Sequence, residues 1–200
     1  MPAPVVSLAT SLTSARLVMR PPRTSDVGAL LASLRRNDAH LRPWSPLRAG
    51  ADRRPTLAFV ARDVAAARRS WRRDDGYTFF AFEAGLKAPR VVGRVTLGKV
   101  IRGPFQNAFL GYWIDVERQG EGLVTEAVGA VLRFAFGPLG LHRVQAGVMP
   151  RNAASIAVVK KLGFREEGLS ARYLQIAGTW EDHVTFAMTS EDWADLTVRR

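Results

Sequence analysis

Hydrophobic residues recur with a helical period of about 3.6 residues in four stretches of this 200-residue chain. The first follows Thr24-Ser25-Asp26, a sequence typical of a helix start, and covers 27–34. The others cover 56–71, 123–135 and 153–162; glycine ends the last two, and Asn152 precedes the fourth. Four amphipathic helices are therefore predicted.

The remaining hydrophobic runs are short and rich in β-branched and aromatic residues, a pattern typical of strands. They cover 16–20, 77–83, 91–100, 105–115, 142–148, 164–174 and 179–188. Turn residues at 85–89 and 103–104 separate the runs 77–83, 91–100 and 105–115, which are predicted to form hairpins. The prolines in 40–46 predict an exposed loop. The order β-α-α-β-β-β-α-β-α-β-β predicts one mixed α/β sheet in a single domain, 15–194, between an N-terminal extension (1–14) and a short tail (195–200).

The composition excludes several kinds of chemistry. The chain has no cysteine, which excludes disulfides, thiolate metal sites and a cysteine nucleophile, and its three histidines are too far apart in sequence to predict a metal site. No apolar run reaches the length of about 18 residues that predicts a membrane-spanning helix. Residues 1–13 lack the basic start of a signal peptide, so a cytoplasmic protein without a metal or membrane association is expected.

The net charge of +11 is the unusual property of the composition. Arginine supplies most of the cations, and the stretch 35–75 contains eleven arginines and five aspartates. Codon bias in a GC-rich genome explains such a composition without a function. The alternative explanation is an anionic partner, either nucleic acid or a phosphorylated small molecule.

The segment from Asp115 to Ala127 predicts a strand that ends in a glycine turn and continues directly into a helix. Gly120 and Gly122 allow close approach of a ligand to the backbone, and the helix start adds free N–H groups and a partial positive charge. This arrangement suits a phosphate group. A P-loop is excluded because Leu123 and Val124 follow the second glycine, and the turn comes too late in the chain for a dinucleotide-binding fold.

Three ordered segments resemble the GNAT N-acetyltransferases. Arg118–Val124 resembles the acetyl-CoA pyrophosphate loop of that family, except that Val124 replaces the usual Gly or Ala, and Asn152–Phe164 resembles its Asn-x-x-Ser…Lys-x-Gly-Phe helix. Arg172–His183 resembles the closing hairpin of the RimJ/RimL branch, which acetylates N-terminal amines of ribosomal proteins. Leu41–Trp44 and Gly103–Phe105 are similar to RimJ in particular, and the resemblance covers residues 16–193.

The resemblance implies the GNAT fold, with a mostly antiparallel sheet of about six or seven strands and about four helices. It also implies that acetyl-CoA binds where the strand ending at Asp115 separates from the strand 142–148. The residues expected to bind acetyl-CoA are Trp113, Ile114, Asp115, Arg118, Gln119, Gly120, Glu121, Gly122, Leu123, Val124, Asn152, Ser155 and Lys161. For Asn152 a simple helix N-cap is the alternative interpretation.

The implied reaction is attack of a neutral amine on the thioester. Glu83, Asp115 and Glu117 are candidates for a general base by their positions near strand ends. Many family members protonate the leaving thiolate with a Tyr at the position of Val159, so Ser155 is the candidate acid here and Tyr173 a weaker one. Bonding to a helix carbonyl is the alternative role of Ser155. Trp44 and Tyr173 are candidates for contacting the acceptor.

The acceptor expected from the resemblance is the N-terminal α-amine of a ribosomal protein. The arginine-rich residues 35–73 would then lie near ribosomal RNA, and the enzyme would act as a monomer or homodimer. One alternative is the same chemistry on a small amine such as an aminoglycoside or polyamine. Another is a ribosome- or RNA-binding module that keeps the fold without activity.

Overall fold

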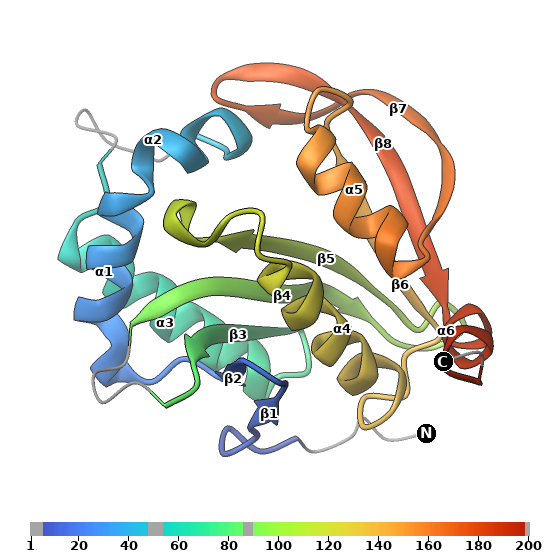
Figure 1. Cartoon of the computed structure of the whole chain (residues 1–200), viewed down its shortest axis with the longest axis horizontal. Coiled ribbons are helices and arrows are strands. Elements are labelled where there is room, and N and C mark those ends of the chain that lie inside the picture. Colours follow the sequence, from blue (N-terminus) through green and yellow to red (C-terminus); the bar gives the residue numbers. More distant parts are fainter. Residues whose placement is uncertain (1–5, 48–53, 86–89, 199–200) are drawn as a thin grey trace.

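A computed structural model describes residues 6–47, 54–85 and 90–198, and these form one sheet covered by helices on both faces (Figure 1). The strands are β1 (Leu12–Thr13), β2 (Leu17–Arg20), β3 (Gly76–Glu83), β4 (Val91–Ile101), β5 (Asn107–Ile114), β6 (Arg143–Val148), β7 (Arg165–Ile176) and β8 (Thr179–Thr189). The α-helices are α1 (Val27–Arg36), α2 (Asp38–Leu41), α3 (Leu57–Arg72), α4 (Leu123–Phe136), α5 (Ala153–Leu162) and α6 (Ser190–Val198). Three short 3-10 turns are η1 (Thr24–Asp26), η2 (Arg42–Trp44) and η3 (Val116–Arg118).

The spatial order of the strands is β1-β2-β3-β4-β5-β6-β8-β7. Every neighbouring pair is antiparallel except β5 and β6, which are parallel and are joined through α4. The predicted mixed α/β class is confirmed. The sheet has eight strands in place of the expected six or seven, because the short strand β1 adds an edge.

Alternate residues of β3 divide the hydrophobic core between the two faces of the sheet. Phe80 and Phe82 pack with α1 and α3 in one buried cluster, whereas Phe79 and Ala81 belong to the main cluster formed with α4 and α5. In Figure 1, α4 and α5 lie in front of the sheet and α3 lies behind it. Because side chains of a strand point alternately to opposite faces, one short strand supports both layers.

All four predicted helices are present, and polar residues cap two of their starts. Thr56 accepts a hydrogen bond from the Phe59 backbone at 3.2 Å, and Asn152 accepts one from the Ser155 backbone at 3.1 Å. Gly163 ends α5 with φ 91°, a left-handed conformation that glycine adopts without a steric cost. Local capping signals therefore predicted these boundaries correctly.

Three segments differ from the prediction. Residues 38–44, which include most of the loop expected at 40–46, form α2 and η2; Pro43 fits because the start of a helical turn needs no N–H donor. Residues 190–198, which include part of the expected tail 195–200, form α6, which begins beside a capping exchange between Thr189 and Asp192 and packs Trp193 on Phe136 at a ring distance of 6.0 Å. The N-terminal extension packs Val6 and other residues on the main core. These segments therefore belong to the folded unit.

No helix in the described part of the chain is both long and apolar enough to cross a membrane. Residues 1–5, 48–53, 86–89 and 199–200, which include parts of the predicted turn 85–89, the arginine-rich stretch and both chain ends, lie outside the described residues.

Candidate functional site

The sheet opens between its two parallel strands. β5 and β6 pair only at Asn107–Arg143, Ala108–Val144 and Phe109–Gln145, although both strands continue beyond these pairs. In Figure 1 the part of the sheet that contains β8 rises away from β5. Residues 110–114 and 146–148 therefore border a gap in the sheet at the place where the resemblance predicted it.

A glycine turn at the end of β5 leads directly into α4. Gly120 and Gly122 both have φ 76°, and Gly122 is the N-cap of the helix. The Glu126 N–H bonds to the Gly122 carbonyl at 3.1 Å, so the N–H groups that precede it in the first turn have no intrahelical partner. The turn thus presents free donors at the positive end of a 14-residue helix, which is a favourable environment for an anion.

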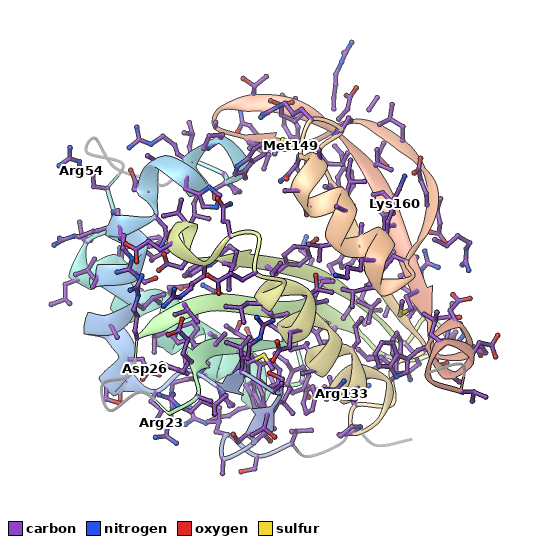
Figure 2. The ribbon with its side chains drawn as sticks, in the orientation of Figure 1. Arg23, Asp26, Arg54, Arg133, Met149 and Lys160 are labelled. Atoms are coloured by element: carbon purple, nitrogen blue, oxygen red, sulfur yellow. The ribbon has the colours of Figure 1, made fainter. Side chains whose placement is uncertain are left out.

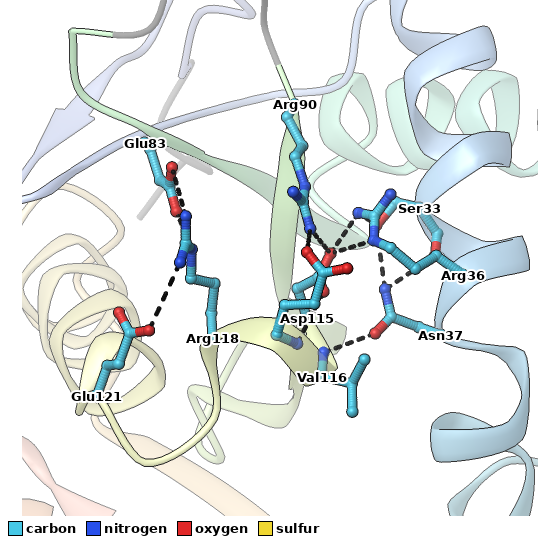
Figure 3. Close-up of polar contacts among 10 residues, drawn as sticks. Ser33, Arg36, Asn37, Glu83, Arg90, Asp115, Val116, Arg118 and Glu121 are labelled. Atoms are coloured by element: carbon cyan, nitrogen blue, oxygen red, sulfur yellow. Dashed lines mark hydrogen bonds and ion pairs between the residues drawn. The ribbon is translucent and has the colours of Figure 1, made fainter.

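Side-chain contacts hold this turn from both sides. Arg118 pairs with Glu83 and lies 3.7 Å from Glu121 (Figure 3), and Gln119 bonds to His40 at 3.1 Å. On the helix side, Arg16 donates to the Glu121 carbonyl at 3.0 Å and pairs with Glu126. The turn is therefore fixed by its side chains, and its backbone donors are not used for that purpose.

Asp115 clamps the end of β5 to α1. Its carboxylate is fully buried and pairs with Arg36 and Arg90, while the Glu117 N–H donates to it at 3.1 Å (Figure 3). Asn37 adds a second link, because its Oδ1 accepts the Val116 N–H at 2.7 Å. Burial raises the pKa of Asp115, but the hydrogen bonds led by Arg36 outweigh it and hold that pKa well below its usual range.

The three carboxylates predicted as general bases all contact arginines. The prediction of Asp115 as a base is wrong, because a buried carboxylate with a depressed pKa that already has two arginine partners is a poor proton acceptor. Glu117 lies 2.5 Å from Arg90, and Glu83 pairs with Arg118. Their contacts support the turn and the end of β5.

The start of α5 faces the gap from the other side. Asn152 is the N-cap of α5, as its alternative interpretation proposed. The hydroxyls of Ser155 and Tyr112 lie 2.7 Å apart, and the Tyr112 hydroxyl is also 3.1 Å from the Ser155 carbonyl. Burial raises the pKa of Tyr112 to about 12, although the hydrogen bond with Ser155 lowers it. Tyr112 therefore stays protonated near neutral pH and can position the Ser155 hydroxyl.

A cavity of about 510 Å³ lies along the outer side of α4, next to the glycine turn. Gly122, Thr125, Arg133 and Lys161 are among the residues that line it. Lys160, which is labelled in Figure 2, pairs with Glu166 at 3.6 Å and does not line the cavity. Of the two lysines at the end of α5, Lys161 is thus the one placed toward the turn.

The predicted acceptor residues lie where α2 and η2 meet the hairpin of β7 and β8. The guanidinium of Arg151 lies 5.0 Å from the centre of the Trp44 ring and also donates to Glu181 at 2.8 Å. The Ala177 N–H donates to the Ser45 carbonyl at 3.0 Å. Tyr173 is half-exposed and contacts the ring of His183 edge-on at 5.6 Å. Trp44 and Tyr173 therefore belong to one region.

The expected acetyl-CoA residues divide into backbone and side-chain contributors. Trp113 packs against the α1–α3 cluster, and the side chains of Ile114 and Leu123 lie in the main core with Val124 packed against it. The polar groups that these four residues can offer to CoA phosphates or amides are those of the backbone, apart from the indole N–H of Trp113. Val124 departs from the family pattern without blocking the turn, because its side chain contacts the core.

Sequence analysis missed several residues that shape the site. Arg36 and Arg90 complete the Asp115 clamp, and no local motif marks either of them. Tyr112 could have been found from strand alternation, which places it on the same face as Leu110 and Ile114, toward the main core.

Comparison with known proteins identifies the class of this fold and site. The family model of the acetyltransferase (GNAT) domain matches residues 16–165. The chain belongs to the GNAT acetyltransferase family and is an N-acetyltransferase by that membership.

Curated relatives include N-acetyltransferases of several bacteria. The chain is 34% identical over 182 residues to the [ribosomal protein uS5]-alanine N-acetyltransferase of Escherichia coli, and the match covers 91% of this chain and 92% of that protein. It is 44% identical over 120 residues to the probable N-acetyltransferase YjcK of Bacillus subtilis, which covers 60% of this chain and 65% of that protein, just under two thirds of its length.

Solved structures agree with the fold. RimJ of Mycobacterium smegmatis in complex with CoA-disulfide has a TM-score of 0.83 and 31% identity, covering 95% of this chain and 93% of that one. The ribosomal-protein-S5-alanine acetyltransferase of Vibrio fischeri also has a TM-score of 0.83, with 29% identity over 92% of this chain and 98% of that one. The GNAT fold and the resemblance to RimJ are thus confirmed.

Proposed function

We propose that this protein transfers the acetyl group of acetyl-CoA to the N-terminal α-amine of a ribosomal protein. The observation that carries the proposal is the gap between β5 and β6 beside the glycine turn of α4. That gap joins an anion-binding helix start to the region of Trp44 and Tyr173. The relatives named for ribosomal-protein alanine acetylation support the choice of acceptor and do not favour either alternative function.

The turn and the gap fit acetyl-CoA as cosubstrate. The pyrophosphate would accept hydrogen bonds from N–H groups of residues 119–124, and the pantetheine would extend along the unpaired ends of β5 and β6. Lys161 and Arg133 would face the phosphorylated nucleoside end of CoA from the cavity beside α4. A structure of the M. smegmatis RimJ relative with CoA-disulfide supports this choice of cosubstrate.

The chemistry needs a neutral amine and a proton for the leaving sulfur. An α-amine titrates near ~8, compared with ~10.4 for a lysine side chain, so an N-terminus reaches the reactive form more readily at neutral pH. Its nitrogen attacks the thioester carbon, the C–S bond breaks, and the thiolate takes a proton. We assign that proton to the Ser155 hydroxyl, because the Tyr112 hydroxyl at 2.7 Å can donate to Ser155 Oγ and leave the Ser155 O–H free to donate.

The basic side of the molecule suits an acceptor bound close to RNA. Arg62, Arg69, Arg72 and Arg73 on and after α3 are exposed and form no ion pair with any other described residue. A second cavity of about 610 Å³ near the start of α3 is lined in part by Arg35, Arg42 and Arg54. In Figure 2, Arg54 lies on the opposite side of the molecule from Lys160 at the end of α5. A cytoplasmic location follows from a ribosomal substrate.

Incubation of ribosomal proteins with the enzyme and acetyl-CoA tests the proposal. Mass spectrometry should find one added acetyl group on the N-terminal residue of one protein, with no gain at lysines. Acetylation of small amines alone would reject the ribosomal acceptor. Binding of RNA without any acetyl transfer would reject the enzymatic function.

A further inference from the structure

His183 is a buried histidine on β8, only 3% exposed, and it faces away from α4 and α5. Its strand neighbours Val184 and Phe186 pack with the main core on the α4–α5 side. Because side chains alternate along a strand, His183 and Thr185 point to the opposite face. This is the face on which the Arg151–Glu181 contact lies, since Glu181 shares the alternation of His183.

The imidazole is fixed in one orientation. Its Nδ1 lies 3.0 Å from the backbone carbonyl of Glu181, and a carbonyl can only accept, so Nδ1 carries the hydrogen. The edge contact with Tyr173 holds the ring from the side. The second nitrogen, Nε2, then carries a lone pair, and it has no hydrogen-bond partner among the described residues.

The Cδ2 side of the ring lies next to Gly147 of β6, the strand between β8 and the gap. Gly147 is exposed and lies two residues beyond Gln145, the last residue of β6 that pairs with β5. A Cβ on Gly147 would lie 3.7 Å from His183 Cδ2, the atom next to Nε2, 3.8 Å from His183 Cβ and 3.5 Å from Tyr173 Cε1. Because Gly147 has no side chain, this part of β6 leaves the Cδ2 side of the imidazole uncovered.

We propose that His183 is the general base of the reaction, with Nε2 accepting the proton of the acceptor amine. This assignment rests on the proposed acetyltransferase function. As the amine nitrogen bonds to the thioester carbon, one N–H proton moves to Nε2, and the C–S electron pair leaves with the sulfur, which takes a proton from Ser155. The imidazolium keeps its Nδ1 bond to the Glu181 carbonyl and returns the extra proton to solvent, from which Ser155 is reprotonated.

The carboxylates near His183 are already engaged. Glu181, on the same face of β8, pairs with Arg151, and Asp182, on the opposite face, accepts the Arg172 N–H at 2.7 Å. The carboxylates predicted from sequence contact arginines around the turn and the end of β5. Gln145 Oε1 is buried without a hydrogen-bond partner among the described residues, but an amide oxygen is not a base at neutral pH. His183 therefore combines a free basic lone pair with a fixed orientation beside β6.

His183→Gln tests the assignment, because glutamine approaches the size of imidazole and cannot act as a base. We expect kcat for an N-terminal peptide of the ribosomal substrate to fall by about 100-fold or more, while acetyl-CoA affinity measured by calorimetry stays within about twofold. His142→Gln is the matched control, since His142 is an exposed histidine before the same sheet region and pairs with Glu191. It should keep wild-type kcat.

A second variant, His183→Ala, opens the same space to free imidazole. Added imidazole should raise its kcat in a saturable manner and leave His142→Gln unaffected. Wild-type kcat in His183→Gln, joint loss of acetyl-CoA binding, or no response of His183→Ala to imidazole would overturn the role of His183. A wild-type enzyme that acetylates no amine would instead reject the proposed function, so the two failures are distinguishable.

Discussion

The two sides of the gap are built in different ways. The proposed cosubstrate side, formed by the turn 119–124 with α4 and α5, presents backbone N–H groups, and its side chains are used to hold the turn in place. The proposed acceptor side, formed by residues 38–47 and the β7–β8 hairpin, presents side chains such as Trp44, Tyr173 and His183. A backbone site depends on conformation and tolerates most side-chain changes, whereas a side-chain site changes its specificity with single substitutions.

Asp115 links the end of β5, which leads to the turn 119–124, to α1, which leads to residues 38–47, so its substitution should have the largest effect. Asp115→Asn removes the charge that Arg36 and Arg90 compensate, and we expect the free energy of unfolding to fall by about 3 kcal/mol at neutral pH. The pKa of this carboxyl is depressed in the folded protein, so its stabilisation is complete above the unfolded value near ~3.9 and is lost as the pH falls through the folded value.

Denaturant unfolding at several pH values measures this effect. The difference between wild type and Asp115→Asn should be constant from neutral pH down to about pH 5 and shrink below about pH 4. A difference that does not depend on pH would show that the clamp stabilises through packing alone. Glu117→Gln, on the exposed part of the same network, should cost less than about 1 kcal/mol.

Gly122→Val should separate the two sides by damaging only the cosubstrate side. A β-branched residue at φ 76° strains the helix start by about 1–2 kcal/mol, so acetyl-CoA affinity should fall by roughly fivefold to thirtyfold. Calorimetry measures the affinity. Val124→Ala is the control, because the Val124 side chain packs against the core, and it should change the affinity by less than about threefold. Equal losses in both variants would contradict a backbone-based site.

Arg151→Ala should damage only the acceptor side. It removes the contact with Trp44 and the pair with Glu181, each worth about 0.5 kcal/mol, so KM for the peptide should rise by about fivefold at unchanged acetyl-CoA affinity. Steady-state kinetics with the peptide varied gives KM. Arg165→Ala is the matched control, as Arg165 is an exposed, paired arginine at the start of the same hairpin, and it should leave KM unchanged.

Lys161→Ala should have the smallest effect. An exposed cation near a CoA phosphate contributes about 0.5 kcal/mol, so acetyl-CoA affinity should fall by about twofold at low salt and by less at high salt. Lys160→Ala controls for the general loss of charge, since Lys160 pairs with Glu166 outside the cavity. The same salt-dependent loss in both variants would mean that long-range charge accounts for the contribution of Lys161.

Sequence alone predicted the features that local signals encode. The cap Asn152 and the hydrophobic periods gave the four long helices, and glycine spacing gave the turn before α4. The contacts that convert these parts into a site join distant residues. Arg36 and Asp115 are 79 positions apart, and Tyr112 and Ser155 are 43 apart. No local pattern reports such pairs, because register and layer packing decide them.

Two features that were not predicted from sequence, α6 and the position of His183, do have a local signal in the sequence. Thr189 and Asp192 have the spacing of a capping box, yet the short segment after them was predicted as a tail and is α6. His183 lies in a segment that the sequence assigned only to the closing hairpin. The alternation of β8 points Asp182 and His183 to opposite faces, which excludes them as a catalytic pair and leaves the histidine alone on the face next to Gly147.

The separation of β5 and β6 also determines how the enzyme should turn over. In the proposed arrangement the gap connects the two faces of one sheet, so acetyl-CoA and the peptide approach from opposite sides and both must be present before the acetyl group moves. Initial-rate lines should therefore intersect, as they do for a ternary complex, in place of the parallel lines of an acetylated-enzyme intermediate. Free CoA should compete with acetyl-CoA and should not compete with the peptide.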